Sequence, residues 1–574
     1  MNGALLLAVG CVLFYLAYHF YGRFIERVLG VDPSRPTPAH TLKDGIDYVP
    51  THPAILFGHH FASIAGAGPI VGPVLAAQYG WVAVVLWVVF GCIFIGTVHD
   101  LVAMFLSIRH QGRSIGTVIE SLMGYWGRML FLFFCWFTLI LVVAEFTRIV
   151  AETFVSMPPV ATASLLFIAV AVVFGRLVYK GGVNIMTASF IFVPLTFACV
   201  YIGTLIPLDL MKLFGCDKAV AAQLWIVVLL VYCFAASVLP VWLLLQPRDY
   251  LNSYLLYAMM ALGFLGIFVA MPTIRLDAFT GWQALNPVSG NRDPLLPLLF
   301  VTVACGACSG FHALVATGTT AKQVDKESHM RPIAYGGMLI EGVLALIALI
   351  AVGVMTQAEY GAAMKTQGAV KLFASGVAGF TDKLGLPHQA GIVFISLALA
   401  AFLMTTLDTA TRLARFTWQE LFLPREKSSG DGQPAEPSKS PPCLCFSNRY
   451  ASTLVAVLAS GWLLLGGGSK SIWPIFASSN QLLAALTLLG AGLWLLRHKR
   501  PVAIVLIPML FMVATSGSAI VTLFTRSLKN WQAHGFQAGG VMTLTSGLLF
   551  VMAATLVILG AASFKNPVKG KHEV

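Results

Sequence analysis

Ionisable side chains stand inside several long apolar stretches of this chain. They are His59, His60, His99, Asp100, Glu145, Arg148, His312, Glu341 and Asp408. If these stretches cross a membrane, each charge at the bilayer centre costs about 3 kcal/mol on insertion scales, so each residue needs a partner or a function. Imidazoles and carboxylates in such places can bind a carboxylate, carry a proton or pair with one another.

Three of the histidines flank glycine-rich segments. His59 and His60 precede the segment GAGPIVGP, and His312 follows the segment CGACSG. We predict that these imidazoles reach one cavity and hold a substrate carboxylate or a proton there. The alternative is a histidine that only hydrogen-bonds a backbone carbonyl, which applies more to His99 than to His60 and His312.

Acidic and hydroxyl side chains form a second set of candidates. Asp100 lies in GTVHDLVAMF, Glu341 lies in GGMLIEGVLALIAL, and Thr405, Thr406 and Asp408 lie in FLMTTLDTATRLARF. Such groups beside opened backbone can relay H⁺ or coordinate Na⁺. We predict that these five residues serve ion coupling, and the sequence does not rank them.

The remaining spacings argue against other chemistry. Glu145 and Arg148 lie three residues apart, which predicts a structural ion pair on one helix face. The four histidines show no HxxxH or HExxH spacing, so we expect no metal site and no cofactor. Cys305 and Cys308 form a CxxC inside a predicted apolar helix without a second pair, which argues against redox or metal chemistry.

The composition places most of the chain in lipid. Of 574 residues, 58% are hydrophobic and 10% are charged, whereas soluble domains have about 25% charged residues. The net charge of +12 is spread over short loops, so it does not indicate nucleic-acid binding. The chain contains no GxxxxGK[ST] phosphate-binding loop, which argues against an ATP-driven pump.

Apolar runs bounded by charge, proline or glycine predict an all-α polytopic membrane protein with about 15 spans. In the first two thirds of the chain their extents are 3–22, 54–78, 80–107, 129–150, 160–178, 184–206, 223–240, 253–273 and 295–317. The later ones are 333–355, 390–411, 451–466, 472–496, 502–525 and 541–562. If successive spans alternate in direction, one side holds 25 of the 36 Lys and Arg residues and the other holds 10. The positive-inside rule then places the N-terminus outside and the C-terminus in the cytoplasm.

Two of the predicted spans should be interrupted. Gly66, Gly68, Pro69, Gly72 and Pro73 interrupt the second span, because proline removes a backbone donor and glycine loosens the turn. The ninth span repeats the pattern at Gly306, Ser309, Gly310 and Gly318 in the opposite direction. Opened backbone is tolerated in hydrocarbon only where it is buried in protein or lines a polar cavity. We therefore predict a substrate site formed by His59, His60, Gly66, Ala67, Gly68, Ser309, Gly310, Phe311 and His312.

The alternative is that these glycines only permit tight helix packing. The clustering of glycine and proline in two antiparallel spans favours broken helices of the kind that secondary transporters place at their substrate sites. The half-helix N-termini exposed at such breaks attract a carboxylate.

The chain divides into four predicted regions. They are 1–53, with the first span and a loop; 54–294, a first repeat-like half with extra helices; 295–496, a second repeat-like half; and 497–574, C-terminal accessory spans and a tail. Within the third, 424–450 is polar and proline-rich, which predicts a disordered cytoplasmic linker.

Five stretches of the sequence resemble the carbon starvation protein A (CstA) family. They are HHFASIAGAGPIVGPVLAAQYGW, PVWLLLQPRDYLN, ACGACSGFHALVATGTTAKQ, LDTATRLARF and WPIFASSNQLLAAL, which together span residues 59–486. The resemblance implies an inner-membrane transporter used under carbon starvation, with peptide uptake or proton-coupled pyruvate uptake as its activity. It also implies a LeuT-like core of two inverted repeats, as in the amino-acid, polyamine and organocation transporters.

The expected function is therefore secondary import of a small carboxylate such as pyruvate, driven by H⁺ or alternatively by Na⁺, in a lipid bilayer. Peptide import is the second hypothesis. A nutrient sensor that binds without transporting is a third hypothesis. A sensor should carry a signalling domain or an ordered cytoplasmic extension, whereas the predicted cytoplasmic parts of this chain are short or disordered. No enzymatic activity is expected.

Overall fold

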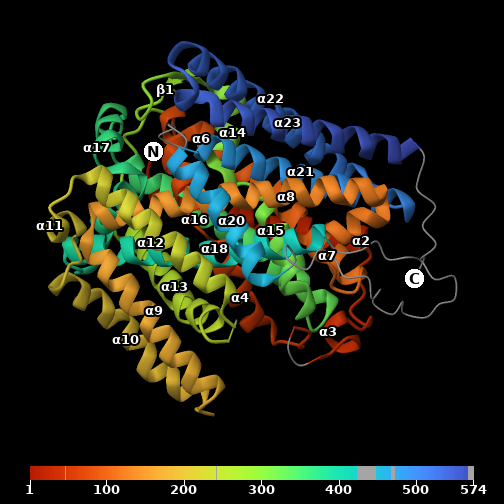
Figure 1. The fold of residues 1–574 in the computed structure, drawn as a ribbon, viewed down its shortest axis with the longest axis horizontal. Helices are drawn as coiled ribbons and strands as arrows, with labels where there is room; N and C mark the ends of the chain where they lie inside the picture. Colours follow the sequence, from red (N-terminus) through yellow and green to blue (C-terminus); the bar gives the residue numbers. More distant parts are fainter. Residues whose placement is uncertain (45–46, 241, 423–447, 467–471, 566–574) are drawn as a thin grey trace.

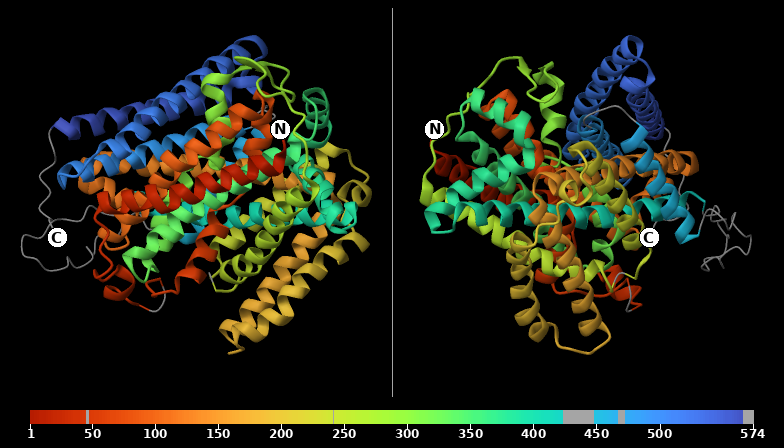
Figure 2. Two further views of the ribbon diagram at one scale, coloured as in Figure 1. Left: turned by 180° about the vertical axis from the view of Figure 1, so that it is seen from behind. Right: turned by 60° about the vertical axis from the view of Figure 1, so that its left-hand side comes forward.

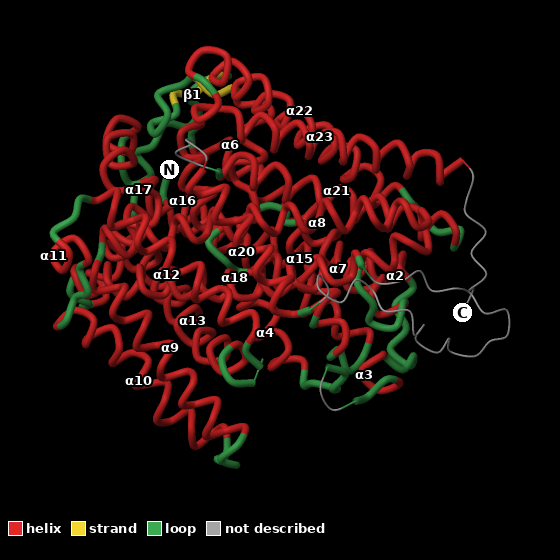
Figure 3. Tube along the Cα trace, in the orientation of Figure 1, coloured by secondary structure: helices red, strands yellow, loops and turns green. Residues whose placement is uncertain are grey.

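In the computed structural model the described part of the chain is mostly helical (Figures 1 and 3). The structure describes residues 1–44, 47–240, 242–422, 448–466 and 472–565. Nearly all of the linker predicted at 424–450 lies outside these described residues.

The first half of the chain contains the following helices: α1 Gly3–Leu16, η1 Ala17–Tyr21, α2 Gly22–Leu29, α3 Pro38–Thr41, α4 Pro53–Ile64, α5 Gly68–Ala76, η2 Ala77–Tyr79, α6 Trp81–Gly91, η3 Cys92–Gly96, α7 Thr97–Arg109, α8 Ile115–Ser156, α9 Pro158–Tyr179, α10 Ile185–Leu205, α11 Leu210–Phe214, α12 Lys218–Val238 and α13 Leu245–Ala270. The second half contains β1 Gln283–Leu285, β2 Arg292–Pro294, α14 Leu295–Val303, η4 Ala304–Gly306, α15 Gly310–Gly318, η5 Thr320–Lys322, η6 Glu327–His329, η7 Arg331–Tyr335, α16 Gly336–Gly353, α17 Gln357–Thr381, η8 Asp382–Leu384, α18 His388–Leu421, α20 Arg449–Gly466, α21 Trp473–Arg497, α22 Ala503–His534 and α23 Phe536–Lys565.

Among the described residues, twelve helices are long and apolar enough to cross a membrane, or up to thirteen if the bent pair α4–α5 counts as one span. The predicted number of about fifteen is therefore not confirmed. Two of the predicted segments account for the difference. The segment 295–317 is divided among α14, η4 and α15, and α20 is a shorter apolar helix.

One long helix, α17, was not predicted from the sequence. Its first turns carry polar residues, and Thr356 and Glu359 cap its start reciprocally. Gly368 has a φ of 75°, which bends the helix in its middle. Neither half of α17 contains a long apolar run, so a prediction of membrane spans from hydrophobicity does not detect this helix.

The first predicted helix break is confirmed. Helix α4 ends at Ile64 and α5 begins at Gly68, and the two axes differ by 45°. The interruption is shorter than predicted, however, because Gly72 and Pro73 lie inside α5. Pro73 is the sixth of the nine residues of α5, and its missing N–H removes one intrahelical bond, the one to the carbonyl of Pro69.

The second predicted break is also present. After α14 and the short η4, three residues without helical structure lead to α15 at Gly310. Cys305 lies in η4 and Cys308 lies in the break, so the prediction that both lie inside an apolar helix is wrong. Both thiols are free and buried.

The two breaks pack against each other. A Cβ built at Gly68 would lie 2.5 Å from Cys305 Cβ, and one built at Gly72 would overlap the carbonyl oxygen of Val303. Gly96 of the neighbouring membrane helix likewise faces the carbonyl of Ala307. Glycine is required at these positions because backbones approach too closely for any side chain.

Two helical hairpins flank this centre. The pair α9–α10 and the pair α22–α23 project from opposite sides of the molecule in both views (Figure 2). Near one end, β1 and β2 form a small antiparallel hairpin, and Asp293 in it forms a 2.6 Å ion pair with Arg526 of α22. The interrupted helices thus lie within a bundle rather than on its surface.

Candidate functional site

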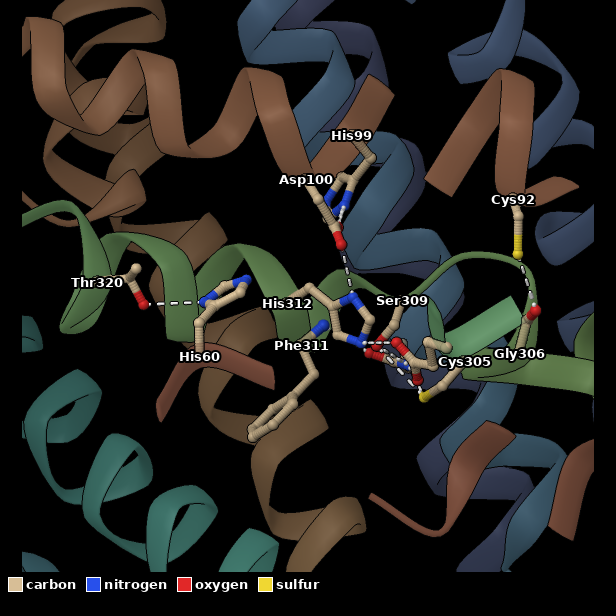
Figure 4. Close-up of polar contacts among 12 residues, drawn as sticks. His60, Cys92, His99, Asp100, Cys305, Gly306, Ser309, Phe311, His312 and Thr320 are labelled. Carbon is tan, nitrogen blue, oxygen red and sulfur yellow. Dashed lines mark hydrogen bonds and ion pairs between the residues drawn. The ribbon is translucent and has the colours of Figure 1, made fainter. Parts of the chain in front are cut away.

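A histidine between two carboxylates lies beside the second break. His312 occupies the first turn of α15, and its Nδ1 lies 2.8 Å from Oδ2 of Asp100 on α7. On its other side, Nε2 lies 3.3 Å from Oε2 of Glu341 on α16. All three side chains have no exposed surface. Helix α7, which lies more than 200 residues before α15 and α16, is thus brought against them, and Figure 4 shows Asp100 beside His312.

Two further histidines surround this cluster. His99 places its Nδ1 2.8 Å from Oδ1 of Asp100, so both oxygens of that carboxylate are paired with imidazoles. His60, at the end of α4, places its Nδ1 2.9 Å from Thr320 Oγ1, and its buried Nε2 has no hydrogen-bond partner among the described residues. The half-buried His59 is adjacent on the helix and points about 100° away from His60.

An asparagine that sequence reasoning missed organises the second break. Asn480 of α21 accepts the backbone N–H of Phe311 at 2.8 Å and donates to Ser309 Oγ at 3.0 Å. Its backbone carbonyl lies against Gly310. The first turn of α15 is thus held by a buried amide. The residue stands in WPIFASSNQ, a stretch noted only for its family resemblance.

The first break leaves backbone donors unpaired. Ala67 and Gly68 are buried at the start of α5, and within the described chain no hydrogen bond is formed by either backbone N–H. Thr406 Oγ1 is also buried and has no hydrogen-bond partner in the described ranges, and it lies 2.8 Å from where a Cβ of Gly66 would be. These groups together form a set of donors suited to an oxyanion.

The predicted ion-coupling residues separate into two clusters. Asp100 and Glu341 join His312, whereas Asp408 on α18 pairs with Arg248 of α13 at 2.7 Å and accepts from Tyr232 at 2.9 Å. Thr405 accepts from Asn252 at 3.1 Å. Arg248 was not identified from the sequence, although it stands in the quoted stretch PVWLLLQPRDYLN. Its position in an apolar region between proline and aspartate was the available signal.

Within the described ranges, no group of three or more His, Cys, Asp or Glu side chains is arranged to hold a metal ion. The histidines near Asp100 are instead engaged with carboxylates or a hydroxyl.

A family model described as "Carbon starvation protein CstA" matches residues 2–367 and 360–519. The chain belongs to the CstA family. It is 33% identical to the peptide transporter CstA of Bacillus subtilis over 99% of this chain and 98% of that protein. It is 31% identical to the pyruvate/proton symporter BtsT of Escherichia coli over 93% of this chain and 83% of that protein.

Solved transporter structures also resemble this CstA-family chain at low identity. A manganese transporter of Eremococcus coleocola has a TM-score of 0.41 at 12% identity and covers 91% of this chain and 98% of its own. MhsT in complex with L-phenylalanine has a TM-score of 0.42 at 13% identity, with 89% and 98% covered.

Glu145 and Arg148 form an ion pair in this CstA-family protein. Arg148 Nη2 lies 2.6 Å from Glu145 Oε1, and Nη1 lies 2.6 Å from the more exposed Glu152. Glu145 also accepts the backbone N–H of Ile472 at 3.2 Å, so it ties the start of α21 to α8.

Replacing Glu145 by Gln should lower the stability of the protein by about 3 kcal/mol, because it removes one partner of a buried charge pair. Glu152→Gln changes an exposed partner of the same arginine and should cost less than about 1 kcal/mol. Thermal unfolding in detergent measures both. Equal losses for the two variants would show that burial of Glu145 contributes nothing.

Proposed function

We propose that this protein is a secondary active transporter of the cytoplasmic membrane that imports a small carboxylate, pyruvate first, together with a proton. The observation that carries this proposal is the buried His312 between Asp100 and Glu341 beside a helix break. A LeuT-like inverted-repeat core, with the N-terminus outside and the C-terminus in the cytoplasm, belongs to the same proposal.

The cluster around His312 suits the binding and release of a proton. With His312 protonated and both carboxylates ionised, its net charge is −1, and one more proton makes it neutral. Because an uncompensated charge in a membrane interior is costly, the state with a net charge of −1 favours contact with water, and the neutral state favours a closed site. Asp100 and Glu341 are thus the proposed proton carriers, and His312 links them.

The first break supplies the matching anion site. The unpaired N–H groups of Ala67 and Gly68, at the positive end of the α5 dipole, and the hydroxyl of Thr406 can hold a carboxylate. Since Gly68 packs on Cys305, this site adjoins the break that carries His312. A carboxylate that enters with a proton moves no net charge. This suits two adjoining sites of which one binds an anion and the other binds a proton.

Peptide import is the second candidate function. Its support is the 33% identity to the Bacillus subtilis peptide transporter over nearly the full length of both chains. A peptide presents the same terminal carboxylate to the donors at Ala67 and Gly68, so the described contacts suit both substrates.

Uptake into proteoliposomes decides between these functions. We expect labelled pyruvate to accumulate when the outside is acidic, and to equilibrate without accumulating when the pH gradient is collapsed. A labelled dipeptide tests the second function under identical conditions, and replacement of Na⁺ by choline tests Na⁺ coupling. Empty liposomes are the control, and failure to take up either compound would reject both functions.

A further inference from the structure

A second buried polar cluster lies between α12, α13 and α18. It contains Arg248 and Asp249 from the start of α13, and Asp408, Arg412 and Arg415 from α18. Each of these five side chains belongs to a residue that is at most 8% exposed. Three guanidinium groups against two carboxylates leave an excess of positive charge, which is costly in a membrane interior unless an anion compensates it.

The guanidinium of Arg248 has one edge occupied and one edge free. Its Nη1 contacts both Asp408 and Tyr232. Its Nε and Nη2 are buried and have no hydrogen-bond partner among the described residues. These two N–H groups point in parallel from one side of the planar group, which is the fork that binds both oxygens of a carboxylate.

The other arginines of the cluster are committed to the backbone. Arg412 Nη2 donates to the carbonyls of Ala236 and Leu239, both at 2.9 Å, and Arg415 Nη1 donates to Ser237 at 2.5 Å. These bonds hold the end of α12 against α18. Arg248 is therefore the member of the cluster whose unpaired donors form a complete fork.

The fork is connected to the proposed substrate site through α13 and α18. Asn252, one turn after Arg248, donates to Thr405, and the next residue, Thr406, faces Gly66 at the first break. Thr406 and Asp408, the partner of Arg248, are two residues apart on α18, which is about 3 Å along the helix axis and about 200° around it. The two sites therefore lie at the same level of α18 on different faces of it. Both oxygens of Asp249 are buried and accept no hydrogen bond from any residue that the structure describes, so its negative charge opposes an anion at this place.

We propose that the Nε and Nη2 edge of Arg248 is a second carboxylate subsite. The transported anion would occupy it after leaving the paired breaks, on its way toward the end of α18 that carries Arg412. This inference rests on the proposed function for the identity of the anion. The subsite is closed in the present arrangement, because the donors are buried. Separation of α13 from α12 would admit the ligand.

The test is the number of pyruvate molecules bound by the full-length protein in detergent, measured by equilibrium binding of radiolabelled pyruvate. The wild type should bind two per chain. Arg248→Lys keeps the positive charge but loses the fork, so it should bind one, or bind the second at least about tenfold more weakly. Asp249→Asn removes an opposing charge without breaking a hydrogen bond, so the weaker site should bind about threefold or more tightly.

Arg128→Lys is the matched control, because Arg128 is also buried, pairs with Glu120 at 3.0 Å and lies outside the cluster. It should bind two molecules, as the wild type does. One site in the wild type, or unchanged binding in both Arg248→Lys and Asp249→Asn, would overturn the proposal. If Arg248→Lys does not fold, Asp249→Asn alone is the test. An unchanged affinity of the weaker pyruvate site in Asp249→Asn would then overturn the proposal.

Uptake separates this inference from the proposed function. Normal wild-type uptake with a single binding site rejects the second subsite and leaves the transporter function standing. Arg248-dependent binding without uptake of pyruvate or dipeptide supports the subsite and rejects the transporter. Methyl pyruvate, which lacks the carboxylate, should not compete at either site, and effective competition by it would contradict recognition of a carboxylate.

Discussion

Replacing His312 by Gln should reduce proton-driven pyruvate uptake by more than about 100-fold. The imidazole lies between Asp100 and Glu341, and its removal leaves two buried carboxylates without the group that separates them. The loss of one partner from a buried charged network costs about 3 to 5 kcal/mol, which corresponds to a factor of 100 or more. Initial uptake rates in proteoliposomes with an acidic exterior measure this loss.

His388→Gln is the matched control, because His388 also pairs with an aspartate, Asp382, at 2.9 Å but is exposed. Its uptake should stay within about twofold of the wild type. The double variant His312→Gln with Glu341→Gln removes the repulsion, so it should regain thermal stability but not proton-driven accumulation. Accumulation of pyruvate driven by a pH gradient in the single variant would exclude His312 from proton coupling.

The positions of the helices and of their breaks could be predicted because they depend on local sequence. The run GAGPIVGP, residues 66–73, contains three glycines and two prolines that disfavour a continuous α-helix, and the observed break at 65–67 overlaps its start. The extent of the break was overestimated, since Gly72 serves close packing on Val303 rather than opening the backbone. A glycine that permits a close approach and one that ends a helix cannot be distinguished in a single sequence.

The partners of the buried charges could not be predicted, because they are set by packing between distant helices. Asp100 and Asp408 were both selected as membrane carboxylates, yet one meets His312 and the other meets Arg248. Helices buried among other helices are apolar on most sides, so hydrophobic periodicity does not show which faces meet. Asn480 was missed for the same reason, since only its contact with Phe311 reveals its position.

These contacts connect the two proposed halves of the transport cycle. The proton cluster depends on α15, whose first turn follows the second break, and the anion donors lie at the start of α5, which follows the first break. Because α5 packs on η4 through Gly68 and Cys305, a movement at one break must displace the other. The contact between Gly68 and Cys305 is therefore the place where coupling of the two halves can be tested.

Gly68→Ala should reduce uptake by at least about tenfold, and Cys305→Gly in the same chain should restore most of it. The new Cβ would lie 2.5 Å from Cys305 Cβ and 2.6 Å from its Sγ, so the breaks must separate by about the radius of a methyl group. Such overpacking costs about 1 to 3 kcal/mol in a core. Cys305→Gly removes both contacting atoms and leaves Cα 3.7 Å away, which is an ordinary contact distance.

Gly517→Ala is the control for this experiment, because Gly517 lies in the membrane helix α22 with no atom within 4 Å of an added Cβ. It should leave uptake unchanged, as should Cys305→Gly alone within about threefold. The rescue is the decisive part, since a loss in Gly68→Ala alone could arise from any local strain. If Cys305→Gly fails to improve uptake of Gly68→Ala, the two breaks do not act through this contact, and a common substrate pocket loses its structural basis.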